Sequence, residues 1–242
     1  MKMVPRVVDI SHYTTVSNFK KTANAGIWGI ICKCTQGISM VDGTYLANRD
    51  KVWDAGMLWG AYHFATGHDP KKQVDHFLAH AAVDDRTLPC LDFEKNPSGT
   101  SMNAEQMLEF LSYGERKIGR KFCIYSGNFL KEQLDDLSVA DQLYICDHKL
   151  WLAQYSSLFK LPTGFTKYFL WQYTGDGMGP EPHTIPGLGG ETGGLDLNVY
   201  DGTREQLIAE WTVQKPVPVV VADNPPSEPI ANTPYYWWEN LY

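Results

Sequence analysis

The chain has little positive charge and no long hydrophobic segment. Its 242 residues include 21 Lys and Arg against 28 Asp and Glu, so the formal net charge is -7. A nucleic-acid partner requires a basic surface, and this balance therefore argues against nucleic acid. No segment contains the run of about 18 apolar residues that a membrane span needs, so we expect no membrane insertion.

The start of the chain also lacks the apolar segment and small-residue cleavage site of a secretory signal peptide. Cysteine is scarce, and its number is odd: Cys32, Cys34, Cys90, Cys123 and Cys146. Most of them fall in apolar, strand-like segments, which favours buried free thiols over a disulfide framework. We therefore expect synthesis without a signal peptide and folding in a reducing cytoplasm.

In the first half of the chain, short apolar segments alternate with helical patterns. The segments predicted as strands are residues 4–10, 27–34, 58–65, 87–93 and 121–126, and those predicted as helices are residues 16–25, 44–55, 69–83, 103–118 and 129–137. Such alternation indicates parallel strands joined by helical crossovers. At 27.3 kDa, the chain is long enough for one large α/β domain.

The second half has strand-like segments joined by loops. We predict strands over residues 143–147, 150–155, 168–173 and 195–200, followed by a helix over 203–211. The whole pattern predicts an irregular TIM-like β/α barrel over residues 1–214, regular in its first half and mostly strand and loop in its second. An open doubly wound sheet is the alternative, but no G-x-G-x-x-G follows the first strand.

Residues 215–242 differ in composition from the rest of the chain. This segment begins as a proline-rich linker and ends in an aromatic tail over residues 235–242. A free tail would not normally expose so many rings, so we expect it to dock on the barrel. Contact with glycan or with another protein is the alternative.

Asp92 and Glu94 lie two residues apart at the end of a predicted strand. Alternation along a strand places both side chains on the same face. Two neighbouring carboxylates do not both ionise readily, so one can stay protonated and donate a proton while the other stays charged. Cleavage of a glycosidic bond uses such a pair, although solvated acids at a strand end are the alternative.

Two further acids, Asp9 and Asp196, belong to the first and last predicted strands. The carboxyl ends of barrel strands meet at one rim, and closure of a barrel brings its last strand beside its first. We therefore expect Asp9 and Asp196 to be neighbours and to share one cleft with Asp92 and Glu94.

The segments that contain these acids, together with several others, resemble glycoside hydrolase family 25. These are the muramidases of the Chalaropsis lysozyme type, which are common among phage endolysins. The resemblance covers about residues 4–212. Nine motifs carry it, in order: Asp9-Ile10-Ser11, Lys33-Cys34-Thr35-Gln36-Gly37, Tyr45 with Asn48, residues 60–65, Leu91-Asp92-Phe93-Glu94, Ile124-Tyr125-Ser126, residues 151–155, residues 171–174 and Leu195-Asp196-Leu197-Asn198.

The resemblance implies hydrolysis of the β-1,4 bond between N-acetylmuramic acid and N-acetylglucosamine in peptidoglycan. Glu94 would be the general acid and then the base, and Asp92 would orient the substrate N-acetyl group as that group attacks the anomeric carbon. Asp9 and Asp196 would tune charge and position. Direct attack by Asp92 and the stereochemical outcome remain open.

The resemblance further implies a monomeric phage or prophage endolysin that needs no cofactor and reaches peptidoglycan after holin-type release. We expect Tyr62, Tyr125, Trp151, Trp171 and Asn198 to bind substrate, although buried aromatics at strand ends are an equally ordinary explanation for the rings. A non-catalytic peptidoglycan-binding or virion structural module is the rival function.

The chain differs from the family at residue 36, and it contains one pair of histidines with the spacing of metal ligands. The family commonly has Glu where this chain has Gln36, which keeps hydrogen bonding but loses the charge, so we expect Lys33 to pair elsewhere and catalysis to be retained. His76 and His80 have a spacing that suits two zinc ligands, but the Glu of H-E-x-x-H is absent, and we predict no metal site.

Overall fold

The computed structural model describes residues 3–190 and 194–213. Its main element is a nine-stranded sheet that closes on itself because β1 pairs with β3 as well as with β11. β4 (Met40–Val41) pairs with β3 alone. The strands of the closed ring are, in sheet order, β1 (Val7–Ile10), β11 (Asp196–Val199), β9 (Leu170–Thr174), β8 (Lys149–Ala153), β7 (Cys123–Ser126), β6 (Thr87–Asp92), β5 (Leu58–Phe64) and β3 (Gly29–Gln36).

The other strands of the ring run parallel to one another, and β11 runs antiparallel to its two neighbours, β1 and β9. The predicted irregular β/α barrel is therefore confirmed, with its irregularity at the closing strand. Because β11 runs in the opposite direction, its first residue lies at the rim where the parallel strands end. Asp196 pairs there with Asp9 across the closure.

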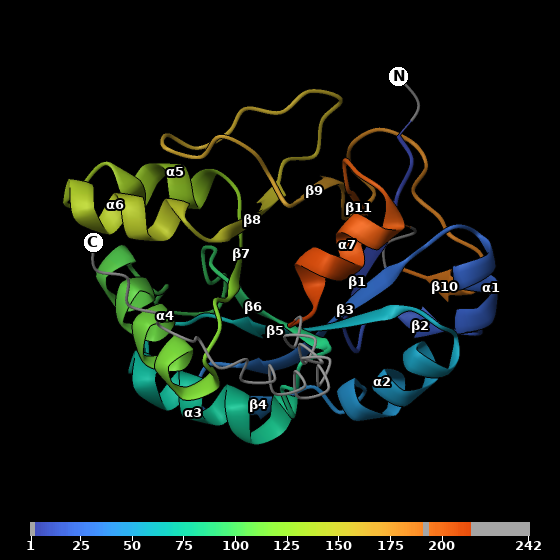
Figure 1. Cartoon of the computed structure of the whole chain (residues 1–242), viewed down its shortest axis with the longest axis horizontal. Helices are drawn as coiled ribbons and strands as arrows, with labels where there is room; N and C mark the ends of the chain where they lie inside the picture. Colours follow the sequence, from blue (N-terminus) through green and yellow to red (C-terminus); the bar gives the residue numbers. More distant parts are fainter. Residues whose placement is uncertain (1–2, 191–193, 214–242) are drawn as a thin grey trace, which may run out of the picture.

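Helices cover the outside of the sheet in the first half of the chain, and loops lead into β9 and β11 in the second (Figure 1). A small second sheet joins β2 (Thr15–Val16) to β10 (Leu188–Gly189). The helices are α1 (Phe19–Asn24), α2 (Tyr45–Asp54), α3 (Pro70–Ala81), α4 (Ala104–Ile118), α5 (Asn128–Leu134), α6 (Val139–Cys146) and α7 (Arg204–Trp211). In the described part of the chain, no helix has the length and apolar character needed to cross a bilayer.

One end of the barrel is closed by α7. Its residues Leu207 and Trp211 are buried in the apolar cluster that fills the barrel interior. The Trp211 indole donates a hydrogen bond of 2.8 Å to the Trp59 carbonyl oxygen, and its ring lies against Gly29, where β3 begins. The amino ends of the parallel strands are thus covered, which leaves the opposite rim for a functional site.

One predicted element was wrong, and another is shorter than predicted. The predicted strand over 143–147 is the end of α6, which begins after Ser138, whose side chain accepts a hydrogen bond from the Asp141 backbone N–H. This N-cap outweighs the β-like composition of the residues that follow. The predicted helix over 16–25 is the shorter α1. It begins later because Asn18 is its N-cap and because Thr15–Val16 forms a strand that pairs with β10.

Candidate active site

A cleft with a volume of about 420 Å³ lies at the rim opposite α7. All four predicted acids line it, and so do three of the predicted aromatic residues: Asp9, Asp92, Glu94, Asp196, Tyr62, Tyr125 and Trp151. The barrel brings together groups from the first, middle and last parts of the chain, as the convergence of strand ends requires.

Asp92 is the last residue of β6, and Glu94 follows two residues later. Burial and the charge of Glu94 raise the pKa of Asp92 well above its usual range, and the Lys33 ammonium opposes that rise. Burial also raises the pKa of Glu94, again against the influence of Lys33. In the described part of the chain, Asp92 Oδ1 is buried without a hydrogen-bond partner. A buried carboxylate oxygen in that state is costly unless a bound molecule supplies a donor.

Asp9 is held by amide groups from two other strands. Gln172 Nε2 lies 3.0 Å from both carboxylate oxygens of Asp9, and Asn198 Nδ2 lies 2.7 Å from Oδ1. Tyr125 donates to Gln172 Oε1 at 2.8 Å, and the Trp151 indole donates to Asn198 Oδ1. This network fixes the position of Asp9 and satisfies both of its oxygens.

Asp196 faces Asp9 across the β1–β11 pair. Burial, followed by the charge of Asp176, raises the pKa of Asp196 to about 7. Burial and the charge of Asp196 raise the pKa of Asp9 as well. A cluster of carboxylates in a desolvated cleft can therefore hold protons near neutral pH, which is the condition for general-acid chemistry.

The aromatic residues divide between the cleft and the outer layer. Trp151 has its ring centroid 4.6 Å from that of Tyr125 and 6.4 Å from that of Tyr62. Trp171 lies outside the cleft and packs against Phe159 at 5.0 Å, because alternation along β9 turns Gln172 inward and Trp171 outward. Trp171 does not line the cleft that holds the four acids, and its contact with substrate stays a prediction.

Asn198 is fully buried and does not line the cleft. Its side chain bonds to Asp9 and to Trp151, so its place in the site is that of a support for Asp9.

Eight residues that line the cleft were absent from the predicted site: Ser11, Tyr13, Lys33, Phe64, Pro97, Tyr155, Gln172 and Asp176. Two had a signal in the sequence, since Lys33 is a charged residue within the largely apolar β3 and Gln172 occupies the inward position of β9. Asp176 adopts a left-handed backbone with φ of 52° in the turn after β9, which sequence alone does not reveal. Strain of this kind in a non-glycine residue is often found at functional sites.

A second cavity of about 500 Å³ continues from the cleft. Glu94, Tyr125 and Tyr155 line both spaces, and Lys95, Phe129 and Gln154 line only the second. Glu94 therefore borders both parts of one extended groove.

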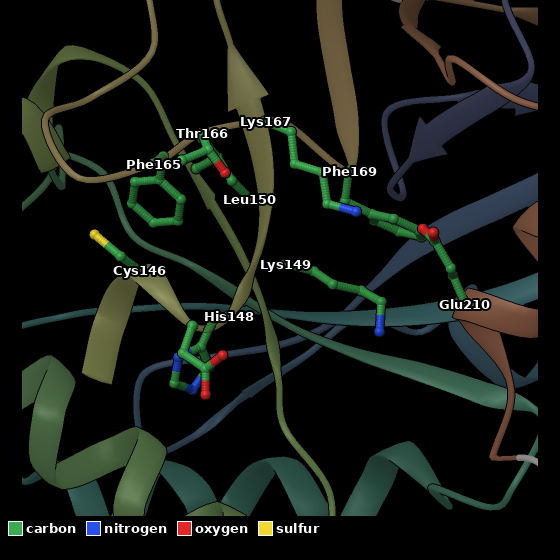
Figure 2. Close-up of a pocket in the computed structure, with 10 residues that line it drawn as sticks. Cys146, His148, Lys149, Leu150, Phe165, Thr166, Lys167, Phe169 and Glu210 are labelled. Carbon is green, nitrogen blue, oxygen red and sulfur yellow. The ribbon is translucent and has the colours of Figure 1, made fainter. Parts of the chain in front are cut away.

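A separate cavity of about 370 Å³ lies where β8 begins and α7 ends, away from the acid cluster. Figure 2 shows Lys149, Lys167 and Glu210 around it. None of the four predicted catalytic acids lines this cavity, so we do not assign the chemistry to it.

The described residues include no group of three or more His, Cys, Asp or Glu that could hold a metal ion. His76 and His80 are engaged with backbone carbonyl oxygens, His76 with that of Met40 at 2.9 Å and His80 with that of His76 at 2.8 Å.

A closed β/α barrel with paired, partly desolvated carboxylates at the carboxyl rim suits the cleavage of a glycosidic bond. Residues 8–181 match the family model described as "Glycosyl hydrolases family 25". The chain belongs to this family and is a glycoside hydrolase.

Individual relatives agree with this assignment. Lysozyme M1 of Streptomyces globisporus is 27% identical over 216 residues, which cover 84% of this chain and 69% of the relative. The bacterial lysozyme of Streptomyces coelicolor has a similar structure, with a TM-score of 0.73, 25% identity, and coverage of 86% of this chain and 97% of its own. The CTP1L endolysin is 26% identical with a TM-score of 0.64, and the match covers 85% of this chain and 69% of that protein.

Proposed function

We propose that the protein is a peptidoglycan hydrolase, an N-acetylmuramidase that cleaves the β-1,4 bond between N-acetylmuramic acid and N-acetylglucosamine. The observation that carries this proposal is the Asp92–Glu94 pair at the end of β6, in the acid-lined cleft of a family 25 enzyme. The names of similar proteins support it, since those from Streptomyces globisporus and Streptomyces coelicolor are both called lysozymes.

Glu94 is assigned the role of general acid. Burial raises its pKa, so it keeps its proton closer to neutral pH than an exposed glutamate would. It borders both parts of the groove, so a glycan that fills both would have a glycosidic oxygen beside it. Glu94 donates its proton to that oxygen as the bond to the anomeric carbon breaks, and then takes a proton from the water that completes hydrolysis.

Asp92 is assigned to the substrate N-acetyl group. Its buried Oδ1 is free to accept a hydrogen bond from the N–H of that group, which would orient the acetyl oxygen toward the anomeric carbon. Direct attack by Asp92 on the anomeric carbon is the alternative route. Asp9 and Asp196 maintain the charge and position of the cluster, and Tyr62, Tyr125 and Trp151 offer ring surfaces to sugar.

The proposal extends to the setting in which the enzyme acts. Similarity to the CTP1L endolysin supports a phage or prophage endolysin that reaches the cell wall after release from the cytoplasm. The chemistry assigned to the acids requires no metal cofactor, and a monomer is sufficient for it.

The first prediction is that Glu94→Gln abolishes turnover while the fold is retained, because the amide has the same shape but cannot donate the proton. General acid-base catalysis is typically worth about 10² to 10⁴-fold, so a loss of that order is expected in the clearing of a peptidoglycan suspension. Glu109→Gln, which changes an exposed carboxylate on α4, is the matched control.

Mass spectrometry of the digestion products completes the test. A muramidase leaves N-acetylmuramic acid at the reducing end of each fragment. N-acetylglucosamine at that end would contradict the proposed bond specificity. Sedimentation of the wild-type protein with peptidoglycan, without any released fragments, would favour the non-catalytic binding module instead.

A further inference from the structure

Among the described residues, Lys33 is the one positively charged side chain that lines the cleft, and it shares the cleft with the carboxylates of Asp9, Asp92, Glu94, Asp176 and Asp196. It comes from β3, which pairs with β1 and β5 in the barrel wall. A single cation among this many acids has a large influence on how they titrate, because the interior of the cleft screens charge less than water does.

The position of the Lys33 ammonium is fixed by a neutral group. Lys33 Nζ donates a hydrogen bond of 2.7 Å to Gln36 Oε1 and lies 4.9 Å from the centre of the Phe64 ring. Gln36 follows three residues later on the same strand and does not line the cleft. It therefore holds the ammonium in place without cancelling its charge.

Asp42 is a further charged group that acts on Lys33, and its oxygens have other hydrogen-bond partners. Asp42 accepts hydrogen bonds from the backbone N–H of His12 and from Thr44, and it pairs with the His12 ring at 2.8 Å. His63, on the neighbouring strand β5, adds no positive charge, because burial lowers its pKa to about 3. Among the carboxylates, Asp92 interacts most strongly with the charge of Lys33, and Asp42 and Glu94 follow.

We propose that Gln36 is a positioning residue that sets the pH range of hydrolysis by holding Lys33 beside Asp92 and Glu94 without neutralising it. This inference rests on the proposed function, in which Asp92 acts ionised and Glu94 acts protonated.

The other groups that face the acid pair act in the opposite direction from Lys33. Glu94 and Asp9 raise the pKa of Asp92, and Asp176 raises that of Glu94. Asp196 lies in the same cleft, and the charge of Glu94 raises the pKa of Asp196. The phenols of Tyr62 and Tyr125 have pKa values raised by burial, so they stay neutral. Lys33 opposes these rises in pKa and favours the ionised form of Asp92.

The test is the pH profile of Gln36→Glu, the second prediction. The new carboxylate would pair with Lys33 and cancel much of its charge, so the pKa values of Asp92 and Glu94 would both rise. The acidic limb reports ionisation of the pair and the basic limb reports loss of its last proton. Both limbs should therefore move to higher pH, by about half a unit or more.

Three variants isolate the effect. Lys33→Met should shift the profile in the same direction, and Lys33→Arg should restore the wild-type position. Gln142→Glu makes the same change of charge on α6, outside the barrel, and should leave the profile unshifted.

The inference is overturned if Gln36→Glu lowers activity equally at every pH, or leaves the profile where it was. The proposed function fails separately, if Glu94→Gln keeps wild-type activity. The two failures are therefore distinguishable on the same substrate.

Discussion

At Gly175, directly after β9, two side chains of the cleft approach the backbone closely. A Cβ atom at this position would lie 2.6 Å from Asp196 Oδ1 and 2.6 Å from Tyr155 Oη. Such distances are far below van der Waals contact, so any larger residue would push one of these groups away. The absence of a side chain at residue 175 is therefore a condition for the geometry of the acid cluster.

The third prediction is that Gly175→Ala lowers hydrolysis by about tenfold or more, because a displacement of about 1 Å near reacting groups can be that costly. The melting temperature should change much less, since the cleft is open and Tyr155 is exposed. Gly43→Ala is the control, because a Cβ there meets nothing within 4 Å. Full activity in Gly175→Ala would show that the cluster tolerates the displacement.

At the scale of elements, α7 stabilises the barrel from its closed end. Trp211 is fully buried, and Arg120 donates a hydrogen bond of 2.8 Å to its carbonyl oxygen. The helix begins with a capping box in which Thr203 and Gln206 satisfy each other's backbone N–H groups. This short helix therefore contributes apolar volume to the interior that the strands alone leave unfilled.

The fourth prediction is that Trp211→Ala destabilises the protein by about 3 to 5 kcal/mol, the usual cost of removing a large buried ring. Denaturant unfolding measures this change. Val213→Ala, at a side chain that is 39% exposed, should cost much less. Equal stability of the two variants would mean that the amino end of the barrel does not depend on this ring.

Helices and strands were predictable from the sequence where the hydrophobic period and the capping residues indicated the same element. Alternation along a strand puts Asp92 and Glu94 on one face, and the same alternation along β9 puts the neighbours Gln172 and Trp171 on opposite faces. The α6 helix was missed because Leu143, Tyr144 and Ile145 have β-like composition, and the N-cap at Ser138 decides the local structure. Long-range pairing, such as the amides of Gln172 and Asn198 on Asp9, has no local signature.

At the scale of the whole molecule, residues 215–242 lie outside the described residues, and docking of the aromatic tail stays a prediction. Burial of one large apolar side chain is worth about 1.5 to 3 kcal/mol, and several rings together could offset the entropy of ordering a short segment.

The fifth prediction follows from that balance. Deletion of residues 215–242 should lower the melting temperature by several degrees and leave turnover of small soluble glycan fragments largely unchanged. Calorimetry and a soluble-substrate assay measure the two effects. Unaltered stability together with lost binding to intact wall would make the tail a substrate-targeting segment instead.

The amide network on Asp9 joins residues that are synthesised far apart in time. Asp9 leaves the ribosome near the beginning of translation, but Gln172 and Asn198 follow only near the end, and Asp196 arrives with the same last strand. A chain that stops before β11 lacks the strand between β1 and β9, and with it the Asn198 amide that bonds to Asp9. The complete acid cluster therefore exists only after the closing strand has been added to the barrel.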